Sequence, residues 1–209
     1  MDTFLEPNEV QLCGTLAQAP AYSHTSRGQE FFRLSLRILR LSGNADTVPL
    51  LIRREQLEAL PLSDAEKLQV SGELRSFNNR RGEGPRLVIT VFARELRFSQ
   101  EEDQNLVRLQ GTLCRPPSFR TTPMGREICD LMLAVNRRYS RSDYLPCICW
   151  GATARRAARW TVGQQLQLEG RIQSREYRKL VDGELLLRTA YEVSATEIEA
   201  TPEGDAATD

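Results

Sequence analysis

The sequence predicts an all-β chain in which one small five-stranded module of about 100 residues occurs twice. The stretch from Leu68 to Phe77 is repeated from Leu166 to Tyr177, and it places Gly72 and Gly170 98 positions apart. Further pairs keep an offset of 97: Gly14 and Gly111, Pro20 and Pro117, Gly28 and Gly125, Leu36 and Leu133, Pro49 and Pro146. Spacing that changes only at loops indicates an internal duplication.

The first copy shows the period-two alternation of apolar residues that is typical of strands with one buried face. Strands are expected over residues 8–16, 31–41, 48–52, 67–77 and 86–98, and a short helix over 55–60, which Pro61 ends. Residues 19–28 have the composition of a loop, and residues 42–46 have that of a hairpin turn. Gly170, the counterpart of Gly72 in the second copy, interrupts a strand and indicates a bulge or a sharp bend.

The second copy repeats this order. Strands are expected over residues 106–115, 127–139, 144–150, 164–177 and 184–198, and a helix over 151–159. Five strands with one helix after the third is the order of the OB-fold, a small, partly open barrel. The predicted architecture is therefore two tandem OB-fold barrels: 1–98, an acidic linker at 99–104, 105–198, and a disordered acidic tail at 199–209.

The zero net charge conceals an uneven distribution of charged residues. Residues 8–98 hold 13 basic and 10 acidic side chains, a net of plus three, and residues 105–198 hold 15 and 9, a net of plus six. The start, linker and tail hold nine acids and no basic residue, which brings the sum to zero. Almost every cation is arginine, which can pair with phosphate and stack on a base. The second module is therefore the more strongly basic one.

The residue types exclude several function classes. The five cysteines lack C-x-x-C spacing and lie in apolar strand patterns, and His24 is the only histidine, so no metal site, cofactor or catalytic residue is expected. Reduced, partly buried thiols fit a cytoplasmic protein. No apolar run approaches the ~20 residues of a membrane span, and no signal segment begins the chain. The expected protein is not an enzyme.

One strand of the second copy suggests a ligand. Arg171, Arg175 and Tyr177 fall on alternate positions, so they project from the face opposite Ile172. Cations beside an aromatic ring on one sheet face suit a charged backbone that carries flat bases.

Three segments carry a resemblance to a known family: Asn105–Leu113, Cys149–Gly151 and Gly170–Tyr177. With the order of the elements over residues 8–198, they resemble the bacterial single-stranded DNA-binding protein family, which includes PriB-like OB-folds. The resemblance implies bases stacked on aromatic residues at the ends of strands two to four and at the start of strand three. The matching residues here are Tyr139, Tyr144, Trp150 and Tyr177.

The first copy differs at these positions. The equivalent residues are Ser42, Thr47, Arg53 and Asn79, and none is aromatic, although Phe77 lies near the last of them. The first module is therefore expected to lack the stacking platform, and the second to carry most of the affinity. For the remaining candidates, contact with the nucleic acid and ordinary packing or solvation are both open: Arg137, Arg138, Phe119 and Arg120 in the second copy, and Arg75 and Phe77 in the first.

The resemblance implies sequence-tolerant single-stranded DNA binding in replication, repair or recombination, with RNA as an open alternative ligand. It implies a homodimer that brings four OB-folds together, at the nucleoid of a bacterial cytoplasm. Replication or repair proteins are candidate partners, but residues 204–209 lack the Pro-Phe tip with which the family recruits them. The alternative is a primosome-type or mobile-element adaptor that uses its OB-folds mainly for protein contacts.

Overall fold

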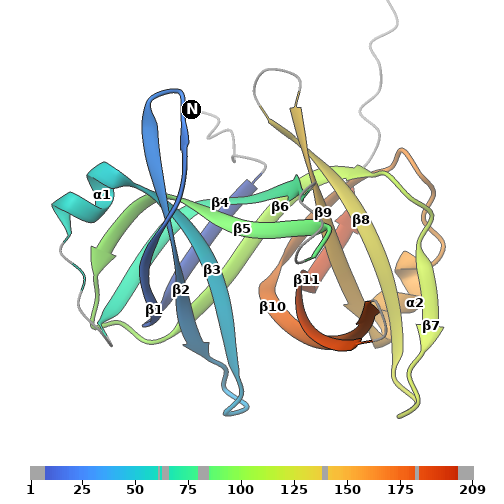
Figure 1. Ribbon diagram of the computed structural model, residues 1–209. Helices are drawn as coiled ribbons and strands as arrows, with labels where there is room; N and C mark the ends of the chain where they lie inside the picture. Colours follow the sequence, from blue (N-terminus) through green and yellow to red (C-terminus); the bar gives the residue numbers. More distant parts are fainter. Residues whose placement is uncertain are drawn as a thin grey trace, which may run out of the picture. The chain divides into compact units, whose positions relative to one another are not determined.

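The structure is a computed structural model that describes residues 8–60, 62, 66–79, 85–137, 141–181 and 184–201. The first repeat consists of β1 (Asn8–Ser26), β2 (Gln29–Leu39), β3 (Ala45–Arg53), α1 (Arg54–Ala59), β4 (Lys67–Asn78) and β5 (Leu87–Phe98) (Figure 1). Strand β1 pairs with both β2 and β4, β2 pairs with β3, and β4 pairs with β5. The parallel pairing of β3 with β5 closes the barrel.

The second repeat has the same order with one additional strand. It consists of β6 (Gln104–Leu113), β7 (Ser118–Thr121), β8 (Glu127–Arg137), β9 (Arg141–Trp150), α2 (Gly151–Ala157), β10 (Gln165–Val181) and β11 (Glu184–Ala200). Strand β6 pairs with β8 and β10, β8 pairs with β9, and β9 pairs in parallel with β11, the neighbour of β10. The prediction of two tandem OB-folds is confirmed.

The chain divides into two compact units, and this division departs from the repeat boundary. One unit holds residues 9–106 together with Ile172–Glu192, the outer part of the β10–β11 hairpin. The other holds Val107–Arg171 and the strand that continues from Val193. The boundary that the sequence predicts within residues 99–104 stays a prediction about which segments fold independently.

The prediction of a loop over residues 19–28 is wrong. Strand β1 continues to Ser26 and stays paired with β2 up to the turn at Arg27 and Gly28. Both turn residues have positive φ, 51° and 77°, as a two-residue hairpin turn of the primed type requires. Irregular register between Leu16 and His24 disrupts the alternation, which hid this strand in the sequence. In the second repeat Pro116 and Pro117 separate β6 from β7 instead.

Gly72 and Gly170 lie at equivalent points where two backbones approach closely. A Cβ atom on either would lie 2.3 Å from a carbonyl oxygen, that of Phe92 for Gly72 and that of Ser194 for Gly170. The register of β4 against β5 shifts between Ser71 and Gly72. A bulge therefore occurs at Gly72, and the bulge predicted at its counterpart Gly170 stays a prediction. Any side chain at either glycine would displace the neighbouring strand.

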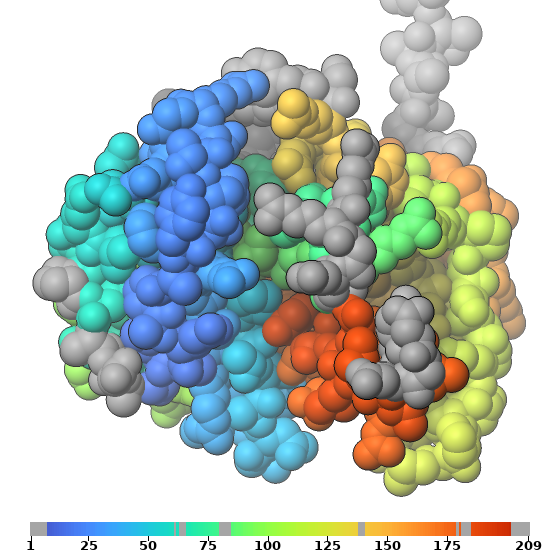
Figure 2. Space-filling model, viewed as in Figure 1, coloured from blue at the N-terminus to red at the C-terminus, as the bar shows by residue number. Residues whose placement is uncertain are grey.

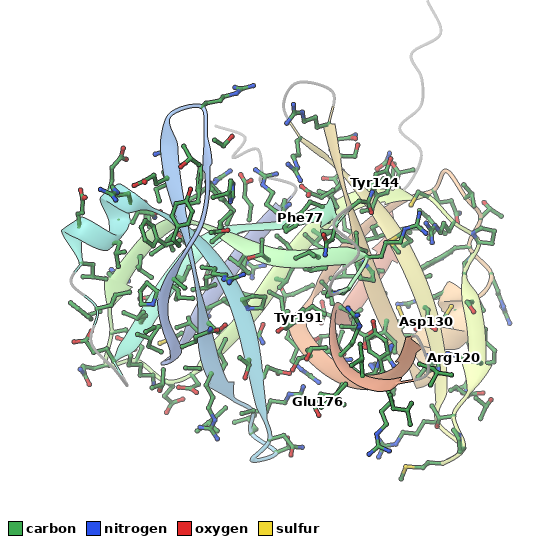
Figure 3. The ribbon with its side chains drawn as sticks, in the orientation of Figure 1. Phe77, Arg120, Asp130, Tyr144, Glu176 and Tyr191 are labelled. Carbon is green, nitrogen blue, oxygen red and sulfur yellow. The ribbon has the colours of Figure 1, made fainter. Side chains whose placement is uncertain are left out.

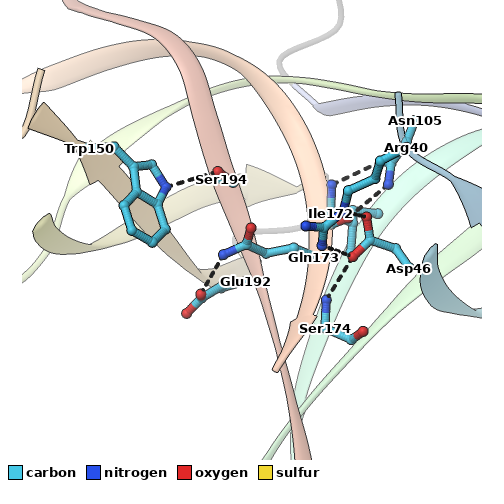
Figure 4. Close-up of polar contacts among 9 residues, drawn as sticks. All are labelled: Arg40, Asp46, Asn105, Trp150, Ile172, Gln173, Ser174, Glu192 and Ser194. Atoms are coloured by element: carbon cyan, nitrogen blue, oxygen red, sulfur yellow. Dashed lines mark hydrogen bonds and ion pairs between the residues drawn. The ribbon is translucent and has the colours of Figure 1, made fainter. Parts of the chain in front are cut away.

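Each repeat also contains a buried ion pair at its hairpin after the second strand. Asp46, 1% exposed, accepts hydrogen bonds from Arg40, and Asp143, 0% exposed, accepts them from Arg137. Asp46 also accepts a bond of 3.4 Å from the Ser174 backbone N–H, as Figure 4 shows. Each pair keeps the 97-residue offset, so the pairing belongs to the duplicated module.

The linker is anchored to the first repeat. The Ser99 N–H donates to the Lys67 carbonyl oxygen at 3.0 Å, and the Cys13 thiol lies 3.6 Å from the Ser99 hydroxyl. The Asp103 carboxylate accepts a hydrogen bond of 2.6 Å from the Leu39 N–H and lies 2.9 Å from the Lys67 ammonium. These bonds fix the path of the linker across β2 and β4.

The linker anchor is expected to weaken in acid. Partial burial raises the pKa of Asp103, but the Leu39 N–H and Lys67 outweigh it and hold this pKa below its usual range. A lowered pKa in the folded state stabilises the protein above the ordinary value of about 4, and this stabilisation is lost as the pH falls through the lowered value. Thermal unfolding followed from neutral pH to about pH 2 should therefore show a smaller acid loss for Asp103→Asn. Equal acid losses in both proteins would contradict this assignment.

Candidate nucleic-acid interface

Strand β9 presents two predicted aromatic residues on one outer face. Tyr144 and Trp150 occupy alternate positions that point away from the buried Leu145 and Cys149, and they are 50% and 38% exposed. Six residues of strand separate them by roughly 20 Å. We call the outer surface formed by Tyr144, Trp150 and their neighbours on β7 and β8 the β8–β9 face.

The indole of Trp150 is held in one orientation. Its Nε1–H donates a hydrogen bond of 3.1 Å to the hydroxyl of Ser194 on β11, a residue that is 4% exposed (Figure 4). The polar edge of the ring is thereby satisfied while part of the ring remains in solvent. A ring fixed before binding loses less conformational entropy when a base stacks on it.

Strand β7 adds a cation to this face. Arg120 is opposite Ile128 on β8, and Ile128 is opposite Trp150 on β9. The Arg120 Nε donates a bond of 2.9 Å to the carboxylate of Asp130, and both side chains are partly exposed (Figure 3). An exposed pair of this kind contributes only about 0–1 kcal/mol, so Arg120 can exchange Asp130 for a phosphate at small cost. Phe119, 42% exposed, projects from the other side of β7.

Of the three residues predicted on one face of β10, Arg175 and Tyr177 lie in contact. The Arg175 guanidinium lies 5.8 Å from the centroid of the Tyr177 ring, a cation–π distance. Both belong to the compact unit that contains residues 9–106 and 172–192, whereas the β8–β9 face belongs to the other unit. Arg171 is half-buried and belongs to the same compact unit as the β8–β9 face.

The other candidate binding residues include some that form ion pairs within the protein and some that lie outside the described residues. Arg137 bonds the buried Asp143, and Arg75 forms an ion pair with Glu73. Arg138 and Tyr139 lie outside the described residues. Phe77 is 53% exposed near the end of β4 (Figure 3). The roles of these residues in binding stay predictions.

The sequence analysis missed an aromatic cluster in the first repeat. The Tyr22 and Phe32 rings have centroids 6.0 Å apart, those of His24 and Phe31 are 5.0 Å apart, and those of Phe31 and Phe92 are 6.2 Å apart. Phe31, Phe32 and Phe92 all remain partly exposed. The signal was present in β2, where Phe31 has the parity of the exposed Arg33.

The described residues contain no group of three or more His, Cys, Asp or Glu side chains that could hold a metal ion. All five cysteines are free thiols, and burial raises the pKa of Cys149 to about 12. A thiol with so high a pKa is a poor nucleophile at neutral pH. No helix in the described segments is long and apolar enough to cross a bilayer.

Comparison with known proteins gives a consistent result. The model of the single-strand binding protein family matches residues 104–201. The single-stranded DNA-binding protein 2 of Listeria innocua is 35% identical over 80 residues, and the single-stranded DNA-binding protein of Halalkalibacterium halodurans is 36% identical over 80 residues. These alignments cover 35% of this chain and 50% and 48% of the relatives, so the chain spans about half the length of the curated relatives it matches.

Solved structures extend the similarity to both repeats. The wild-type single-stranded DNA binding protein from Thermus aquaticus superposes with a TM-score of 0.74 at 25% identity, covering 97% of this chain and 96% of that chain. A deletion variant of the same protein gives a TM-score of 0.75 and covers 98% of that chain. The match over both barrels and the family model over the whole second repeat show that the chain resembles the single-strand binding protein family.

Proposed function

We propose that this chain binds single-stranded DNA with little dependence on base order, and that the second repeat supplies most of the affinity. The observation that carries the proposal is the pair of exposed aromatic residues on one strand, Tyr144 and Trp150, with Arg120 in register with Trp150 two strands away. Tyr139 and Tyr177 complete the proposed stacking set, and Arg171, Arg175 and Arg138 are proposed phosphate contacts. The family consists of DNA-binding proteins and not of enzymes.

Stacking and charge pairing explain sequence tolerance. Every nucleobase has a flat face, so a fixed indole or phenol accepts any of them. Arginine pairs with the phosphate groups, which are identical along the strand. A role in replication, repair or recombination follows from such binding, because each of these processes exposes single strands.

Tryptophan fluorescence tests the proposal. The chain has two tryptophans, so Trp160→Phe leaves Trp150 as the only indole reporter. Titration with oligothymidine should quench this emission, because stacking brings a base onto the Trp150 ring. The matched control is Trp150→Phe with Trp160 retained, whose emission should change little. Binding without quenching would contradict stacking on Trp150, and no binding of oligothymidine would leave the adaptor function as the better account. Parallel titration with oligouridine compares RNA with DNA.

Binding should be salt-sensitive and nearly indifferent to sequence. Each neutralised phosphate of a single strand contributes a log–log salt slope of about −0.7, because bound counterions are released. We expect a linear loss of affinity with increasing log salt concentration and similar affinities for mixed sequences at fixed salt. A preference of several decades for one sequence, measured by competition at one salt concentration, would overturn the stacking mechanism.

We expect a homodimer that assembles four OB-folds, in agreement with the commonest symmetry of soluble oligomers. The β10–β11 hairpin carries four exposed leucines, Leu180, Leu185, Leu186 and Leu187, which provide apolar surface for association with a second copy. Light scattering should give twice the chain mass of 23.7 kDa. The double variant Leu185→Glu/Leu187→Glu should give the monomer mass. A wild-type monomer at micromolar concentration would contradict the prediction.

A further inference from the structure

Four side chains form a row across the outer face of the first repeat, one from each of four strands. In the strand register His24 on β1 is opposite Phe31 on β2, and Phe31 is opposite Arg53 on β3. Phe92 on β5 adjoins β3 through the pairing of Leu51 with Phe92. We call His24, Phe31, Arg53 and Phe92 the aromatic row.

The members of the row contact one another face to face or at an angle. The rings of His24 and Phe31 are stacked, with centroids 5.0 Å apart and planes 16° apart. The Arg53 guanidinium carbon lies 4.9 Å from the centroid of the Phe92 ring, and the Phe31 ring lies 6.2 Å from the same ring. The row is therefore one continuous surface of flat groups.

The row is not part of the barrel interior. Alternate residues of the same strands fill the core, and Leu34, Ile52 and Val91 are at most 1% exposed. The row has the opposite parity, and His24 is exposed. The β1–β2 hairpin that carries His24 and Phe31 lies at the surface of the molecule (Figure 2).

The charges around the row favour a polyanion. Strand β2 continues the outer face with Arg33 and Arg37. Arg37 helps to lower the pKa of the Asp103 carboxyl, whereas Arg33 makes no ion pair within the part of the chain that the structure describes. The neighbouring acid Glu30 is neutralised by Arg54, and Glu73, opposite Phe92, by Arg94. Cations without ion pairs beside flat rings form the combination that binds a single-stranded nucleic acid.

The equivalent place in the second repeat is built with the residue types exchanged. Arg53 corresponds to Trp150, and Phe92 corresponds to Ser194. In the second repeat β9 carries the aromatic ring of Trp150, and β11 carries the Ser194 hydroxyl that orients this ring. In the first repeat β5 carries the Phe92 ring, and β3 carries the Arg53 guanidinium that lies over it. The first repeat therefore has flat side chains here, although the positions where the family has aromatic residues hold other residue types.

We propose that the aromatic row is a second binding surface for single-stranded DNA, with bases stacking on His24 and phosphates contacting Arg33. The proposal rests on the proposed function of the chain and adds the first repeat to its binding surface. A DNA strand that is too long for one barrel should gain affinity from the row. A short strand bound to the second repeat should gain none.

The experiment uses the full chain, two lengths of oligothymidine and a matched pair of variants. One oligonucleotide of about 8 nucleotides fits a single OB-fold, and one of about 40 exceeds two. His24→Ala/Arg33→Ala removes one ring and one cation from exposed positions. Gln69→Ala/Arg97→Ala removes an exposed arginine and its hydrogen-bond partner from the β4–β5 pairing instead.

We expect His24→Ala/Arg33→Ala to weaken binding of the long oligonucleotide by about tenfold or more and to leave binding of the short one unchanged. The control variant should bind both lengths like the wild type. Unchanged binding of the long oligonucleotide, with normal quenching of Trp150 by the short one, would overturn the role of the row alone. Failure of both lengths to bind the wild type would overturn the proposed function itself. Circular dichroism and thermal unfolding should confirm that both variants are folded.

Discussion

Replacing Trp150 and Tyr177 together by alanine should nearly abolish binding of single-stranded DNA. Each stack of a base on an aromatic side chain is worth roughly 1–3 kcal/mol by alanine substitution, so the loss of two should weaken binding roughly 30-fold or far more. Arg175 lies over the Tyr177 ring, and Arg120 is in register with Trp150 two strands away, so the change leaves the proposed phosphate contacts without nearby stacked bases. The measurement is a titration by fluorescence anisotropy of a labelled oligonucleotide at fixed salt.

Phe77→Ala is the matched control for this variant. Phe77 is an exposed aromatic residue of the first repeat, and its loss should cost little affinity. Because Trp150→Ala also removes the hydrogen bond to Ser194, thermal unfolding must first show that the double variant is folded. If Phe77→Ala proved the more damaging change in folded protein, the first repeat would carry the main site and the assignment would be reversed.

Arg137→Met should strongly destabilise the second repeat. Asp143 is fully buried, so removal of its arginine leaves a buried carboxylate without this pairing. Breaking a buried pair in this way costs about 3–5 kcal/mol, and the 25% exposure of the Arg137 side chain places the expected loss at the lower end. Chemical denaturation should therefore show a lower midpoint, and Arg40→Met should do the same through Asp46.

Arg120→Met provides the comparison. Its pair with Asp130 is exposed on both sides, so the expected change in the free energy of unfolding is within about 1 kcal/mol. The two arginines thus separate stability from binding: Arg137→Met should act on folding and Arg120→Met on DNA affinity. A stable, folded Arg137→Met protein with weakened DNA binding would show that Arg137 serves the ligand, as the sequence analysis allowed.

The sequence predicted most of the fold because the duplication tests each strand twice. Two residues 98 positions apart, Gly72 and Gly170, occupy equivalent crowded positions, so the repeat spacing reflects a physical constraint on the backbone. The second half of β1 could not be found in this way. Its irregular register against β2 removes the strict alternation, and Pro116 and Pro117 break the equivalent segment of the second copy.

The candidate site was predicted only in part, for a related reason. Tyr144 and Trp150 were identified because they match family positions on a regular strand. The ion pair of Arg137 with Asp143 could not be anticipated, because it joins two strands across a hairpin whose register was unknown. The aromatic row was missed because its members come from four strands, and only the closure of the barrel brings them together.

The exchange between Arg53 with Phe92 and Trp150 with Ser194 has a consequence for assembly. In an oligomer of identical single-barrel chains, every barrel must carry the same surface, and any substitution alters all of them at once. Here the two barrels are parts of one polypeptide, so their surfaces occur in a one-to-one ratio at any expression level. One barrel can therefore acquire new chemistry while its covalently linked companion keeps the old one.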